Sequence, residues 1–228
     1  MGDRHYRMDR PEYRNEAREN IYDSRVRDLN EFVDGLRARK PDQFIPYISP
    51  EFGGSSARLL LLTLSPGEKT RLDSSGGSGF LSTENTDPAA FRIAEAMDSA
   101  GIARTDCVGW NAYPWYVHGL GGMRAERQDP YLREGVDLLI QVIARLPELR
   151  AVFVFGRAPE RAWGYFGKEY PRTRRSLAFF YHRSTGPKGY QGTKLEQIEW
   201  RRELFESMTA AKRAIEETSQ RGRPISRR

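Results

Sequence analysis

Cysteine is almost absent from this chain of 228 residues, which has a single one, Cys107. One cysteine cannot form an internal disulfide, and it cannot provide the ligands of a cysteine-bound zinc or iron–sulfur site within one chain. The chain also lacks any apolar run near the ~20 residues that cross a bilayer, and its charged start has no apolar region typical of a secretory signal. We therefore expect a cytoplasmic protein with no membrane partner, no metal and no cofactor.

The formal net charge is +6 at pH 7, and a basic balance favours a polyanionic partner. The length predicts one domain, which we expect to be monomeric and to span residues 12–218. It should begin with a charged amphipathic helix over residues 12–39. The polar residues 1–11 and the basic residues 219–228 are predicted to be disordered.

An unbroken apolar run, RLLLLTLSPG over residues 58–67, predicts a buried strand of a parallel sheet that ends at a turn. Three further apolar runs predict strands over residues 106–110, 151–155 and 177–181. Helical spacing of apolar residues predicts helices over 88–100, 131–146, a short stretch from 158, and 193–217, with loops over 68–79, 119–130 and 167–175. Strands that alternate with helices predict an α/β fold with a parallel sheet covered on both faces.

Polar side chains follow three of the predicted strands, at the point where each strand ends. They are Ser65, Asn111 and His182. The carboxyl ends of parallel strands meet at one edge, where open α/β sheets bind ligands. Pro66 and Gly67 follow Ser65, and a glycine lets the backbone approach a ligand closely. The sequence therefore predicts a substrate site at this edge, bordered by Pro66 and Gly67.

Five segments carry a resemblance to a known family. They are LLLLTLSPG (59–67), GFLSTENTDPAAF (79–91), WNAYPW (110–115), VFVFGRAPERAW (152–163) and FYHRSTG (180–186). Together, and in this order, they resemble motifs of the uracil-DNA glycosylase superfamily. The resemblance implies a three-layer α/β/α sandwich with a central, mostly parallel four-stranded sheet. It also implies an enzyme of DNA repair that flips a base out of DNA and hydrolyses its N-glycosidic bond, leaving an abasic site.

The resemblance implies roles for individual residues. Ser65 falls where the family positions a water molecule, and Phe80 falls where an aromatic ring stacks on the flipped base. Asn111 falls at the asparagine that reads the Watson–Crick edge of the base. His182 falls at the histidine that contacts an oxygen of the leaving base, and Ser184 at the serine that holds a DNA phosphate.

Two motifs depart from the family pattern. The first has Leu64 and Ser65 where the family usually has Asp, Asn or Glu, and a hydroxyl is a poor general base. Some branches place the water-activating carboxylate after the stacking aromatic residue. Glu84, with Asn85 beside it, is therefore predicted to place the water together with Ser65. The last motif reads His-Arg-Ser-Thr instead of His-Pro-Ser-Pro.

Basic residues in the loops after the predicted strands are candidates for contacts with the DNA backbone. We expect such contacts from Lys69, Arg183 and Lys188, together with Ser184, to duplex or single-stranded DNA with a flipped base. Uracil is the default substrate. Three alternatives stay open: a glycosylase for a bulky modified cytosine in phage DNA, with a defence role; a non-catalytic DNA-binding module with the same fold; and a glycosylase of free nucleosides or nucleotides.

Overall fold

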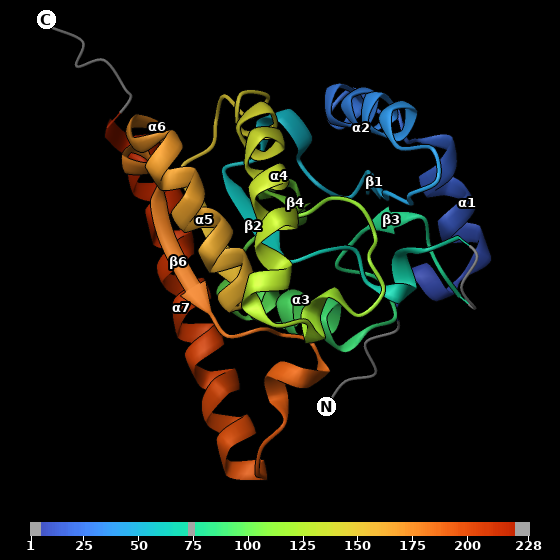
Figure 1. Ribbon diagram of the computed structural model, residues 1–228. Helices are drawn as coiled ribbons and strands as arrows, with labels where there is room; N and C mark the ends of the chain where they lie inside the picture. Colours follow the sequence, from blue (N-terminus) through green and yellow to red (C-terminus); the bar gives the residue numbers. More distant parts are fainter. Residues whose placement is uncertain (1–5, 73–75, 222–228) are drawn as a thin grey trace, which may run out of the picture.

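The computed structural model describes residues 6–72 and 76–221, with side chains up to residue 217 (Figure 1). Its central sheet has four strands in the order β4-β2-β5-β6, and every neighbouring pair is parallel. The strands are β2 (Leu59–Thr63), β4 (Cys107–Asn111), β5 (Ala151–Phe155) and β6 (Ala178–His182). The predicted α/β fold with a parallel four-stranded sheet is therefore confirmed, and all four strands end at the same edge, which we call the carboxyl edge.

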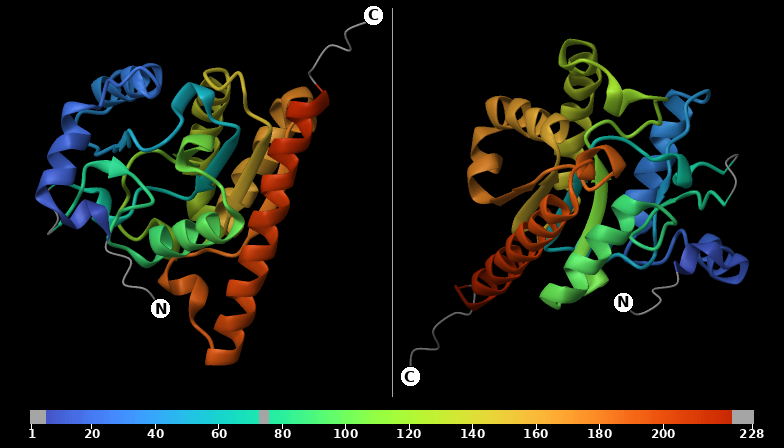
Figure 2. Two further views of the ribbon diagram at one scale, coloured as in Figure 1. Left: turned by 180° about the vertical axis from the view of Figure 1, so that it is seen from behind. Right: turned by 90° about the horizontal axis from the view of Figure 1, so that it is seen from below.

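Helices cover both faces of this sheet, so the molecule has the three layers that were expected (Figures 1 and 2). On one face lie α3 (Pro88–Ala100) and α7 (Lys194–Arg221). On the other lie α4 (Ala125–Ile143) and α5 (Arg157–Glu169), and the short helix α6 (Pro171–Ser176) follows α5. All five side chains of β5 are buried, because a strand in the middle layer has a helix layer on each side.

The chain order of the strands reverses beside β2. From β2 the chain passes to β4 on one side, and from β4 it crosses to β5 on the other side. In open α/β sheets, the crevice outside the carboxyl edge at such a reversal is the usual place for a ligand. The fold thus directs attention to the ends of β2 and β4.

The N-terminal region differs from the prediction. A 3₁₀-helix (Arg7–Asp9) and α1 (Pro11–Glu19) occupy part of the segment expected to be disordered, whose first five residues lie outside the described part of the chain. The single helix expected over residues 12–39 is two helices, because α2 (Arg27–Arg39) begins only after a turn. In that turn Asp23 accepts hydrogen bonds from the backbone and side chain of Arg25, which compete with helical bonding.

A second, two-stranded parallel sheet consists of β1 (Tyr47–Ile48) and β3 (Phe80–Leu81). Its strands are too short for the alternation of apolar and polar residues that identifies a strand in a sequence. Asn30 of α2 joins it to the helix, since its Oδ1 accepts from the Ile48 amide at 2.8 Å and its Nδ2 donates to the Ile48 carbonyl at 3.1 Å.

Three boundaries were also wrong. The helix expected from residue 131 begins at Ala125, within the predicted loop 119–130, because Pro130 is tolerated inside α4 at the loss of one N–H donor. Part of the predicted basic loop 167–175 is helical, with Pro171 in the first turn of α6. The tail expected to be disordered from residue 219 continues α7 to Arg221, and the residues after it lie outside the described part of the chain. Every described helix is too short or too polar to span a bilayer.

Candidate active site

A pocket of about 170 Å³ lies at the carboxyl edge, next to the ends of β2 and β4. Residues from β2, from the turn after it, from the segment 81–87, from the start of α3 and from β4 form its wall. Four of the predicted site residues line it: Ser65, Gly67, Asn85 and Asn111. The structure therefore brings Ser65 and Asn111 together, as the ends of parallel strands predicted, and adds Asn85 from a distant loop.

Asn111 ends β4, and its side chain is 1% exposed. Thr63 at the end of β2 donates a hydrogen bond of 2.7 Å from its Oγ1 to Asn111 Oδ1. The Asn111 Nδ2 group is buried and has no partner. A buried donor left unpaired costs about 1–3 kcal/mol, so this amide is prepared for an acceptor on a ligand.

Asn85 shows the complementary arrangement. It is 2% exposed, and its Nδ2 donates to the Phe80 carbonyl at 2.9 Å. Its Oδ1 is buried without a partner. Two asparagines that line the pocket therefore each have one buried amide atom without a partner, a donor on Asn111 and an acceptor on Asn85, and Trp110 adds its buried, unpaired Nε1 donor.

The turn after β2 forms the near side of the pocket. Ser65 is half-buried there, and the turn is held because Thr70 Oγ1 donates to the Gly67 carbonyl at 2.6 Å. Pro66 is buried and is not among the residues that line the pocket. Of the two residues predicted to border the substrate site, Gly67 therefore lines the pocket and Pro66 does not.

Phe80 does not line the pocket, so its ring is not placed to stack on a base bound there. Its side chain is 1% exposed and packs in a small apolar cluster with Met8 and Ala17 of the N-terminal region. Its neighbour Leu81 lines the pocket instead, because successive residues of a strand point to opposite faces. The predicted stacking role of Phe80 is thus contradicted by its direction.

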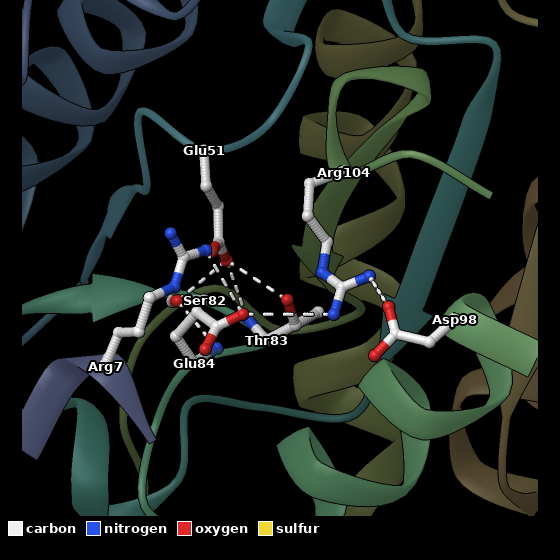
Figure 3. Close-up of polar contacts among 7 residues, drawn as sticks. All are labelled: Arg7, Glu51, Ser82, Thr83, Glu84, Asp98 and Arg104. Atoms are coloured by element: carbon white, nitrogen blue, oxygen red, sulfur yellow. Dashed lines mark hydrogen bonds and ion pairs between the residues drawn. The ribbon is translucent and has the colours of Figure 1, made fainter. Parts of the chain in front are cut away.

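Glu84 is not among the residues that line the pocket, and its carboxylate points toward Arg7 and Arg104 (Figure 3). Its carboxylate lies 3.3 Å from Arg7 and 3.8 Å from Arg104 and is almost buried. Glu51 lies beside it, 3.6 Å from Arg7. Glu84 therefore belongs to a buried ionic cluster with Arg7, Glu51 and Arg104, and the structure does not give it the predicted role in activating water.

His182 ends β6 but does not reach the pocket. Its Nδ1 lies 2.9 Å from the Arg183 carbonyl, and its Nε2 lies 2.9 Å from the Trp200 carbonyl of α7. Burial lowers the pKa of His182, and these two carbonyls oppose that shift. The imidazole thus ties β6 to α7, and β2 and β5 separate its strand from β4. The predicted contact with a leaving base is not supported.

The predicted DNA-contacting residues lie in loops at the carboxyl edge. The Arg183 guanidinium stacks on the Trp200 ring, 3.4 Å from its centroid. Ser184 is exposed and its Oγ accepts from the Gly186 amide at 3.3 Å, while Lys188 is exposed in the next turn. Lys69 follows β2 and is half-buried. Ser184 and Lys188 are therefore free to meet a polyanion, whereas Arg183 is held by an aromatic ring.

Sequence reasoning missed five polar residues of the pocket, of which Thr63 and Asp87 bear most on its chemistry; the others are Thr70, Ser82 and Thr83. Thr63 is the last residue of an apolar strand, and nothing in the sequence marks its hydroxyl as the partner of Asn111. Asp87 is the N-cap of α3 and accepts from the amides of Ala89 and Ala90, both at 2.9 Å. Its position in the pocket wall depends on how α3 packs on the sheet.

No protein-family model and no curated protein matches this chain. The resemblance to uracil-DNA glycosylases therefore stays a prediction, and the function is argued from the pocket. Within the described residues, no group of three or more His, Cys, Asp or Glu side chains is placed to hold a metal ion.

Proposed function

We propose that the protein is a DNA glycosylase that flips a pyrimidine out of DNA and hydrolyses its N-glycosidic bond, with uracil as the default substrate. One observation carries this proposal: a small pocket at the carboxyl edge is lined by Asn111 and Asn85, which have a buried, unpaired amide donor and a buried, unpaired amide acceptor. The motif resemblance supports it independently, since Asn111 falls at the base-reading asparagine. Base flipping is required because the reacting atoms are otherwise buried in the stack.

The pocket has the size of one small ring. A protein cavity of about 150 Å³ is known to hold benzene, and this pocket measures about 170 Å³. A pyrimidine therefore fits inside it. A cytosine that carries a bulky substituent fits only if the substituent projects through the open side, which favours uracil over that alternative.

The polar groups match the edge of a pyrimidine. Uracil presents a carbonyl oxygen next to a ring N–H on its Watson–Crick edge. Asn111 Nδ2 would donate to the oxygen, and Asn85 Oδ1 would accept from the N–H. As the glycosidic bond breaks, negative charge develops on the leaving base, and a fixed N–H donor in a buried site stabilises such charge. Ser65, at the near side of the pocket, would orient the attacking water.

The positions of His182 and Glu84 favour one competing function, a DNA-binding module without catalysis. Both residues resemble catalytic positions of the family, yet both are engaged in bonds within the fold. Such a module would bind an extruded base between the two asparagines and release the DNA unchanged.

The test is release of free uracil from a uracil-containing oligonucleotide, with alkali used to cleave the abasic strand. We expect release by the wild type and a loss of about 100-fold in kcat for Asn111→Ala, because one charge-stabilising donor is removed. Glu84→Gln serves as the comparison variant and should retain the wild-type rate. Tight binding without release, over a panel of pyrimidines, would establish the module instead.

A further inference from the structure

Asp87 is the one carboxylate that lines the pocket among the residues that the structure describes. It stands at the start of α3, in the same wall as Asn85. Its Oδ1 atom accepts from the amides of Ala89 and Ala90, which caps the helix. Its Oδ2 atom accepts no hydrogen bond from any described residue, and it is not sealed from solvent. One half of this carboxylate is therefore structural, and the other half is available.

The cap holds the available oxygen in place. Two backbone amides bind Oδ1 at 2.9 Å, so the carboxylate cannot rotate without losing both bonds. The helix behind it packs against α7 along one face of the sheet (Figure 2). A catalytic group needs such a fixed position, because its effect depends on a reactive geometry maintained before the substrate arrives.

The electrostatic surroundings of Asp87 also suit a general base. Burial raises the pKa of Asp87, while the two amides and Arg92 oppose the shift. A carboxylate with a raised pKa accepts a proton more readily than an exposed one, and general bases work best as their pKa approaches the working pH. Ser65 lines the same pocket but has only a hydroxyl to offer.

We propose that Asp87 is the general base of this site, taking a proton from the water that attacks the sugar. This inference rests on the proposed function. In the step, the water oxygen bonds to C1′ and one of its protons passes to Asp87 Oδ2. The bond between C1′ and the base nitrogen breaks, and its electron pair leaves with the base. The proton on Asp87 is then released to solvent, and the departed base takes up one proton, so that one water is consumed.

The deciding variant is Asp87→Asn. Asparagine caps helices as well as aspartate does, so the thermal midpoint should stay within a few degrees of the wild type. We expect kcat for uracil release to fall by at least about 100-fold, the usual contribution of a general base. The Kd for the uracil oligonucleotide should change less than about 3-fold. The acid limb of the wild-type pH profile should disappear.

Two further measurements separate the possible outcomes. Asp87→Ser also caps a helix, and it should be as inactive as Asp87→Asn while remaining folded. If both variants release uracil at the wild-type rate and Asn111→Ala does not, Asp87 is only a cap and the glycosylase assignment stands. If the wild type releases no base from any pyrimidine substrate, the proposed function fails and the role of Asp87 fails with it.

Discussion

At the scale of single residues, the orientation of two side-chain amides determines what the pocket can bind. Thr63 fixes one end of Asn111, and the Phe80 carbonyl fixes one end of Asn85. Each amide therefore presents its other end, a donor in one case and an acceptor in the other. Because these bonds lie within the fold, the recognition surface exists before any ligand binds, which lowers the cost of ordering on binding.

A first prediction concerns His182. Burial holds its pKa below the ordinary value of 6.5, so the unfolded chain binds a proton that the folded chain resists. The contribution of neutral His182 to the stability of the fold is complete above pH 6.5, and it is lost as the pH falls through the lowered pKa. Unfolding free energies measured in urea between pH 8 and pH 5 should therefore fall less steeply in His182→Gln than in the wild type. Equal slopes in the two proteins would contradict this role.

At the scale of elements, the segment 81–87 forms one wall of the pocket, and Glu51 and the N-terminal region hold it in place (Figure 3). Glu51 Oε1 accepts from Ser82 Oγ at 2.7 Å and from the Thr83 amide at 2.8 Å. The Met8 amide donates to the Glu84 carbonyl at 3.2 Å. The N-terminal region, predicted in part to be disordered, therefore supports the wall that carries Asn85 and Asp87.

This brace leads to a prediction for Glu51. Glu51→Ala removes the acceptor of the half-buried Ser82 hydroxyl and of the buried Thr83 amide, and we expect a loss of about 1–3 kcal/mol in the free energy of unfolding. Glu51→Gln keeps an acceptor. Burial raises the pKa of Glu51, so the neutral amide also avoids a charge that the site disfavours. Chemical denaturation should show Glu51→Gln closer to the wild type than Glu51→Ala, and the reverse order would disprove the brace.

A pair of helix glycines tests the packing of α4 against the segment that follows β4. A Cβ atom on Gly135 would lie 1.7 Å from the Ala112 carbonyl oxygen, directly after β4. A Cβ atom on Gly164 of α5 would meet nothing within 4 Å. We expect Gly135→Ala to cost at least about 1–3 kcal/mol by overpacking, and Gly164→Ala to gain about 0.5–1 kcal/mol. Thermal unfolding of the two variants measures these changes in stability. A Gly135→Ala variant as stable as the wild type would mean that α4 lies further from the end of β4.

The elements differ in how far the sequence could predict them. The four central strands were found because each is a continuous apolar run, as burial on both faces requires. The strands β1 and β3 were missed because two residues are too few to show the alternation of apolar and polar side chains that marks a strand. The direction of Phe80 could not be predicted either, since it depends on Met8 and Ala17, which fold against it from the start of the chain.

At the scale of the whole molecule, parallel strands bring distant polar residues to one edge, and this part of the site was predictable. Ser65 follows β2 and Asn111 ends the neighbouring β4, so topology alone places them together. His182 also ends a strand, but its ring is bound by the Trp200 carbonyl, 18 residues later in the chain. The direction of such a side chain therefore depends on packing between distant elements, which the local sequence does not show.

The net charge of +6 supports a further prediction about DNA binding. If the carboxyl edge meets the phosphates, the logarithm of the affinity should fall linearly with the logarithm of the salt concentration. Lys188→Ala should reduce that slope by about 1, as expected for one lost phosphate contact. Arg175→Ala removes an exposed charge just before β6, at the opposite edge, and should leave the slope unchanged. Equal slopes for both variants would mean that the DNA does not bind at the carboxyl edge.

The central claim is that the pocket between Asn85 and Asn111 holds an extruded pyrimidine. The most direct measurement is a crystal structure of the protein with an oligonucleotide that carries 2′-fluoro-2′-deoxyuridine, whose fluorine slows cleavage of the glycosidic bond. We expect the uracil ring inside the pocket, with its carbonyl oxygen within about 3 Å of Asn111 Nδ2 and its ring N–H facing Asn85 Oδ1. A stacked, unflipped uracil bound over a different surface, with this pocket empty, would contradict the claim.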